Sequence, residues 1–135
     1  MLGHAGLGVL DIGCGAGHYI AELRARGAAE VVGVEGSATL LGHARDMVGR
    51  DAAVTLHHHD LEEPLDFLSD DSFDLAVAAL VHHHSEDRTQ LLAELHRVLR
   101  PGGTLLLRRG PRRDPLRDQW LHQLVLPYDD ADLPG

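Results

Sequence analysis

The chain has 135 residues, of which 44% are hydrophobic and only 4% aromatic. This length fits a single domain, and the composition is typical of an α/β protein with an aliphatic core rather than of a disordered chain. The formal net charge of −9 argues against binding to nucleic acid, which requires clustered cations.

The cysteine content and the length of the apolar runs indicate in which compartment the protein is located. The single cysteine, Cys14, excludes an internal disulfide and favours a reducing, cytoplasmic compartment. No run reaches the about 18 apolar residues of a membrane-spanning helix, and the first residues lack the charged start of a signal peptide. We therefore expect a cytoplasmic protein with no membrane partner.

Apolar runs alternate with helical patterns along most of the chain, which is typical of a parallel sheet covered by helices. We expect strands over residues 8–12, 31–35, 54–58, 73–79 and 104–107. Helices are expected over residues 18–26, stopped at Gly27, and from Leu40 to Val48 with Ser37 as cap. A third helix, capped by Ser85, has an apolar stripe that extends from Leu91 to Leu99. Residues 101–103, Pro-Gly-Gly, then turn the chain into the last of these strands.

The segment after residue 109 has a different composition. It is rich in the breakers Gly and Pro, and only residues 116–126 could form a helix. No further strand is convincing there. The sequence therefore predicts a core over residues 1–109 and an irregular tail with one possible helix over residues 110–135.

Three glycines at alternate positions separate the first strand from the first helix: Gly13, Gly15 and Gly17. Glycines so closely spaced let backbone amides approach a ligand at the positive end of a helix. Glu35 ends the second strand, where a carboxylate can accept hydrogen bonds from both hydroxyls of a ribose. Together these residues predict a site for a nucleoside cofactor.

These motifs resemble those of the class I S-adenosylmethionine-dependent methyltransferases, in particular the small-molecule "type 11" group. The resemblance covers about residues 9–107. It rests on D-x-G-x-G at residues 11–15, the acid Glu35, Asp60 after the third strand, S-F-D-L at residues 72–75 and L-R-P-G-G at residues 99–103, in the order of the family. It implies a Rossmann-like, doubly wound and mostly parallel sheet with strand order 3-2-1-4-5.

The resemblance also implies an activity and its site. The activity is methyl transfer from S-adenosylmethionine to a small-molecule acceptor through an O, N or C nucleophile, with S-adenosylhomocysteine as product. Asp11 would hold the methionyl ammonium, Glu35 the ribose hydroxyls and Asp60 the adenine amino group. The cofactor-binding residues implied are Asp11, Gly13, Cys14, Gly15, Gly17, Glu35, Gly36, Asp60, Leu61, Ala78 and Ala79. His83, or its neighbour His84, would face the acceptor as a base or positioning group.

Two competing interpretations of the same residues are weaker. A dinucleotide-binding fingerprint requires a glycine three residues after Gly15, where this chain has His18. Two triple-histidine runs, at residues 57–59 and 82–84, invite a metal site. Successive side chains of a strand point to opposite faces, and no further ligands stand at a suitable spacing, so we predict no metal.

The chain departs from the family pattern at both ends. It starts almost directly at the first strand, and its tail offers neither of the two strands that usually follow the fifth. We therefore expect no final antiparallel hairpin and an open edge at the fifth strand, which a homodimer could cover. The alternative function is that of a truncated, non-catalytic remnant that binds the cofactor, or of a regulatory module.

Overall fold

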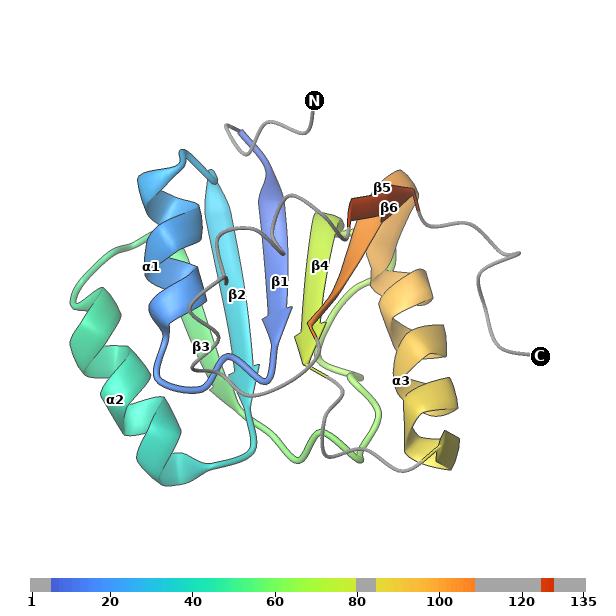
Figure 1. Cartoon of the computed structure of the whole chain (residues 1–135), viewed down its shortest axis with the longest axis horizontal. Coiled ribbons are helices and arrows are strands. Elements are labelled where there is room, and N and C mark those ends of the chain that lie inside the picture. The colour runs from blue at the N-terminus through green and yellow to red at the C-terminus, as the bar shows by residue number, and fades with distance from the viewer. Residues whose placement is uncertain (1–5, 80–84, 109–124, 128–135) are drawn as a thin grey trace. The chain divides into compact units, whose positions relative to one another are not determined.

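The computed structural model describes residues 6–79, 85–108 and 125–127 of the chain (Figure 1). The chain forms two compact units, Met1–Glu63 and Pro64–Gly135. The first unit contains three strands and two helices: β1 (Gly8–Ile12), α1 (His18–Ala25), β2 (Glu30–Glu35), α2 (Ala38–Val48) and β3 (Val54–His58).

The strands of the first unit are parallel and in register. Strand β1 pairs with β2, and β2 pairs with β3, with Glu35 opposite His58 at the carboxyl end. In Figure 1 the arrowheads of β1 and β2 point the same way, toward the turns that lead into α1 and α2. These turns hold the glycines and Glu35, so the predicted site residues of this unit gather at one edge.

The ends of both helices follow from local chemistry. At the end of α1, Gly27 has a φ of 97°, and Ala28 N donates to Leu23 O at 3.0 Å. This left-handed ending strongly favours glycine, as predicted for Gly27. At the start of α2, Ser37 Oγ accepts a hydrogen bond from Leu40 N at 3.2 Å, which confirms the predicted cap.

The core of the first unit is aliphatic. In β1, β2 and α1, seven apolar side chains are completely buried (0% exposed): Val9, Leu10, Ile12, Ile20, Leu23, Val31 and Val34. Strands buried on both faces are expected to be continuous apolar runs, because helices cover a parallel sheet. The sequence pattern and the burial therefore agree.

The second unit contains β4 (Phe73–Ala79), α3 (Ser85–Val98), β5 (Leu99–Arg108) and β6 (Val125–Pro127). Strand β4 pairs with β5 in parallel, from Leu75 opposite Thr104 to Ala79 opposite Arg108. Phe73 pairs with Leu99 whereas Leu75 pairs with Thr104, so the register of the two strands shifts between Phe73 and Leu75. The chain therefore pairs with β4 before the Pro-Gly-Gly turn, and β5 begins earlier than the predicted residue 104.

The strand order is β3-β2-β1-β4-β5-β6, which confirms the predicted order 3-2-1-4-5. The last strand corrects two expectations. Residues 125–127 pair antiparallel with Thr104–Leu106, so a further strand does follow β5, and its edge is not open there. The argument for a homodimer through that edge therefore fails over these residues. Of the predicted helix, residues 125 and 126 are in β6, and residues 116–124 lie outside the described part of the chain.

Candidate functional site

The glycine-rich turn after β1 closes on itself and on β2. Gly13 N and Cys14 N donate to Val34 O at 2.8 and 3.2 Å, and Gly17 N donates to Cys14 O at 3.1 Å. All three alternate glycines have a positive φ, of 74°, 59° and 90°, which side-chain-bearing residues rarely adopt. The turn uses these amides internally, and its direct contact with a ligand stays a prediction.

Glu35 is the acid that this turn holds. Its Oε1 accepts a hydrogen bond from Gly15 N at 2.7 Å, and its Oε2 accepts one from Ser37 N at 3.0 Å. The residue is only 6% exposed. The structure thus brings Gly15 and Glu35 together, as the sequence predicted.

A fixed carboxylate of this kind fits a ribose. An ionised carboxylate can accept about four hydrogen bonds, so the two amides use only part of its capacity. The two oxygens of Glu35 are already oriented by amides from two different turns. Two vicinal hydroxyls are the donor pair that such a carboxylate can accept. The residues present therefore fit the ribose of an adenosyl cofactor.

Gly17 has a second role that the sequence did not show. A Cβ at this position would lie 3.1 Å from Ala44 Cα and 3.2 Å from Ala44 Cβ. The turn therefore packs directly against α2, with Ala44 itself completely buried. A side chain at residue 17 would need α2 to give way slightly and would also be strained by the positive φ of 90°; the predicted contact of Gly17 with the methionyl group is a separate matter.

Asp60 and Leu61 follow β3 in the first unit. Asp60 Oδ1 accepts from Glu62 N at 2.9 Å, and Asp60 O accepts from Glu63 N at 3.0 Å, so the carboxylate caps the next turn. Asp60 is exposed and Leu61 half-buried. The preceding amide, His59 N, donates to Glu35 O at 3.1 Å. The backbone before Asp60 therefore adjoins Glu35, and the contact of Asp60 with adenine stays a prediction.

The remaining predicted residues have diverse positions. Asp11 is 0% exposed and lies opposite Gly33 in the β1–β2 register, and Cys14 is buried as well. In the second unit Ala78 and Ala79 end β4, and Ala78 is completely buried. His83 and His84 lie outside the described residues.

Two residues beside Glu35 were missed as site residues. Ser37 was predicted only as a cap, yet its amide also holds Glu35 Oε2. His58 was considered only for metal binding, yet its Nε2 lies 3.1 Å from Gly36 O. The first contact left no clear signal in the sequence, because acceptance from the amide two residues on is typical of Asp and Asn side chains rather than of Glu. The second contact crosses between strands and leaves no local signal.

The histidines of β3 were also considered as metal ligands. Within the described ranges, no group of three His, Cys, Asp or Glu side chains could hold a metal ion. Partial burial, together with repulsion from His59, lowers the pKa of His57 below its usual value. In the same ranges no helix has the length and apolarity needed to cross a membrane.

Comparison with known proteins identifies relatives of this chain. The methyltransferase GfsG of Streptomyces halstedii is 39% identical over 104 residues, which are 76% of this chain and 37% of that protein. The malonyl-(acyl-carrier protein) O-methyltransferase of Pectobacterium atrosepticum is 32% identical over 105 residues, 78% of this chain and 39% of that protein. The chain thus spans well under half the length of these curated relatives.

A solved structure and a family model complete the comparison. The crystal structure of an S-adenosylmethionine-dependent methyltransferase from Mesorhizobium loti has a TM-score of 0.70 and 34% identity, over 79% of this chain and 48% of that one. A family model described as a methyltransferase domain matches residues 10–107. Since that match covers most of the sequence, the chain belongs to the class I S-adenosylmethionine-dependent methyltransferases.

Proposed function

We propose that this chain binds S-adenosylmethionine and takes part in methyl transfer to a small-molecule acceptor. The observation that carries the proposal is Glu35, a nearly buried carboxylate fixed by Gly15 N at 2.7 Å and Ser37 N at 3.0 Å. A carboxylate held this rigidly at the carboxyl end of a parallel strand is suited to a ribose diol. Membership of the methyltransferase family supports the adenosyl cofactor over other nucleosides.

In this proposal the chain contributes orientation more than chemistry. When bound, the cofactor supplies a methyl group already activated by a positively charged sulfur. Glu35 would fix the ribose, Asp60 the adenine and Asp11 the methionyl ammonium, while Gly13, Cys14, Gly15, Gly17, Gly36, Leu61, Ala78 and Ala79 would line the cofactor. Holding the reacting groups in line can supply much of the rate enhancement.

The acceptor side of the site is a proposal from sequence position alone. His83 and His84 follow the end of β4, and either imidazole could take the proton that an attacking hydroxyl or amine loses. An oxygen nucleophile is supported by the O-methyltransferase of Pectobacterium atrosepticum among the relatives. His83→Ala and His84→Ala should then slow methyl transfer while leaving cofactor affinity unchanged.

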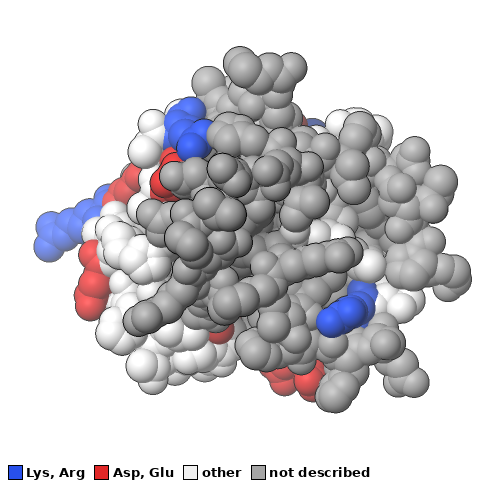
Figure 2. All heavy atoms as spheres, in the orientation of Figure 1, with Lys and Arg blue, Asp and Glu red and all other residues white. Residues whose placement is uncertain are grey.

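Charge supports a small acceptor over nucleic acid. The formal net charge is −9, and the few described Arg side chains visible in Figure 2 lie at separate places on that face. Nucleic-acid binding instead relies on clustered Lys and Arg. The single cysteine supports the proposed cytoplasmic location.

The decisive experiment is calorimetric titration of the full chain with S-adenosylhomocysteine. The matched pair of variants is Glu35→Gln and Glu30→Gln, because Glu30 begins the same strand, is exposed and lies at the opposite end. We expect Glu35→Gln to weaken binding at least about tenfold, since a hydrogen bond to a charged group contributes about 1.5–3 kcal/mol. Glu30→Gln should bind as the wild type does.

Two results would count against the proposal. One is no heat of binding by the wild-type chain at millimolar ligand. The other is equal affinity of the Glu35→Gln and Glu30→Gln variants, provided that thermal melting shows both to be folded. If binding occurs, incubation with labelled S-adenosylmethionine and a metabolite extract distinguishes an enzyme from a non-catalytic binding module.

A further inference from the structure

The turn that carries Glu35 is held from three directions. The Glu35 carboxylate is bound by Gly15 N and Ser37 N. The backbone of the same turn is bound by the last residue of β3 and the residue after it, because His58 Nε2 lies 3.1 Å from Gly36 O and His59 N donates to Glu35 O at 3.1 Å. Two consecutive carbonyls, those of residues 35 and 36, are therefore tied to two consecutive histidines.

The contact of His58 has a defined direction. A carbonyl oxygen can only accept a hydrogen bond, so His58 must carry its proton on Nε2 to donate to Gly36 O. In the β2–β3 register His58 is the residue opposite Glu35. The ring therefore bonds to the residue just beyond the one it faces, where β2 turns toward α2.

Gly36, whose carbonyl His58 contacts, is weakly constrained by packing. Glycine has the widest backbone freedom of all residues, and Gly36 is exposed. A Cβ at this position would meet only His59 O, at 3.5 Å, so packing places little constraint on it. The hydrogen bond from His58 restrains Gly36, which lies between Glu35 and Ser37. The positions of these two residues determine the orientation of the Glu35 carboxylate.

We propose that His58 is a positioning residue for the ribose of the cofactor: its Nε2–H holds Gly36 O and thereby fixes the turn that orients Glu35. This inference rests on the proposed function and assigns a role to a residue outside the motifs of the family resemblance. His58 does not itself contact the ligand in this role. Its effect reaches the ligand through the Glu35 carboxylate.

The test compares three histidine variants by calorimetry with S-adenosylhomocysteine. His58→Ala should weaken binding about three- to tenfold, the range expected for loss of one hydrogen bond. His58→Gln should restore most of the affinity, because its side-chain amide can donate to the same carbonyl. His43→Ala, at an exposed position in α2, is the matched control and should bind as the wild type does.

A second ligand separates a positioning role from a general structural one. The 2′-deoxy analogue of S-adenosylhomocysteine lacks one of the hydroxyls that Glu35 would accept. The effect of His58→Ala should therefore be clearly smaller for this analogue than for the parent ligand. A variant that was merely less well folded would lose affinity for both ligands equally and would melt at a lower temperature.

The possible outcomes separate failure of the positioning role of His58 from failure of the proposed function. If the wild type binds S-adenosylhomocysteine and Glu35→Gln weakens it, but His58→Ala binds normally or loses both ligands equally, the positioning role is wrong and the proposed function stands. If the wild type binds neither ligand, both are wrong. Failure of His58→Gln to restore affinity would also count against the hydrogen bond.

Discussion

Gly17 and Gly42 differ in how much room they leave for a side chain, one in the turn that packs against α2 and one within α2. Gly17 has a φ of 90°, and a Cβ there would lie 3.1 Å from Ala44 Cα, a backbone atom of α2. Gly42 is within α2, and a Cβ at its position would point into open space, with nothing within 4 Å. The same substitution should therefore have opposite effects.

We expect Gly17→Ala to lower the free energy of unfolding by about 1–3 kcal/mol, from the left-handed backbone and from displacement of α2. Gly42→Ala should raise it by about 0.5–1 kcal/mol, because alanine restricts the unfolded chain and favours the helix. Urea unfolding followed by circular dichroism measures both. Equal effects of the two substitutions would show that Gly17 is not in close contact with α2.

The residue scale also shows what the sequence could predict of the site. Glu35 was identified from its place at the end of a strand beside the glycines, and its bond to Gly15 confirms that they meet. The contacts of Gly17 with Ala44 and of His58 with Gly36 were missed. Each joins residues far apart in the sequence through packing or strand pairing, so neither composition nor spacing carries a local signal of it.

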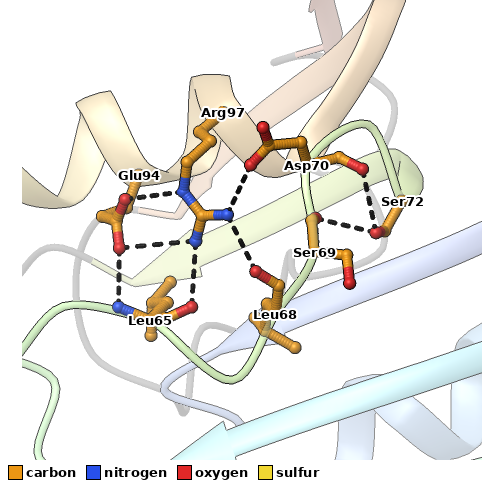
Figure 3. A network of polar contacts seen from close by, with 7 residues as sticks. All are labelled: Leu65, Leu68, Ser69, Asp70, Ser72, Glu94 and Arg97. Atoms are coloured by element: carbon orange, nitrogen blue, oxygen red, sulfur yellow. Dashed lines mark hydrogen bonds and ion pairs between the residues drawn. The ribbon is translucent and has the colours of Figure 1, made fainter.

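At the scale of elements, Arg97 connects α3 to the loop before β4 (Figure 3). Its guanidinium donates to Leu65 O at 2.9 Å, to Leu68 O at 2.8 Å and to Glu94 Oε2 at 2.9 Å. Glu94 Oε1 in turn accepts from Leu65 N at 2.7 Å. The hydrogen bond from Arg97 lowers the pKa of Glu94, so both partners are charged where they hold the loop.

Arg97→Ala should lower the free energy of unfolding by about 1–3 kcal/mol, because it leaves two loop carbonyls without their guanidinium donor and removes the charged partner of a partly buried carboxylate. Arg100→Ala is the matched control. Its side chain is 52% exposed and pairs with Asp74, and such exposed pairs contribute about 0–1 kcal/mol. Urea unfolding gives both values. The role of Arg97 is refuted if the two variants are equally stable.

The elements themselves were mostly predictable. Strands β1, β3 and β4 have the predicted bounds, because apolar runs bounded by turns are a local property. The start of β5 and all of β6 were not. Strand β6 is a three-residue segment that ends in Pro127, and it is a strand only through its pairing with Thr104–Leu106. A sequence pattern so short does not distinguish a strand from a helix.

For the whole molecule, acid is the condition that should matter most. The chain has 11 histidines, and protonating all of them would change the formal net charge from −9 to +2. The sequence pI is about 5.5, so repulsion between molecules weakens as the pH approaches that value. Stability in mild acid must therefore be measured at low protein concentration, where association does not intervene.

The lowered pKa of His57 determines whether acid raises or lowers the stability of the chain through this residue. Partial burial and repulsion from His59 lower its pKa in the folded chain, whereas the unfolded value is about 6.5. Between these two values the unfolded chain binds more protons at this residue, so stability rises with pH and falls on acidification below about pH 6.5. His57→Gln should lose less stability than the wild type between about pH 7.5 and 5.5, as measured by urea unfolding. His43→Gln, exposed on α2, should retain the acid sensitivity of the wild type, and a His57→Gln variant that did so as well would contradict the prediction.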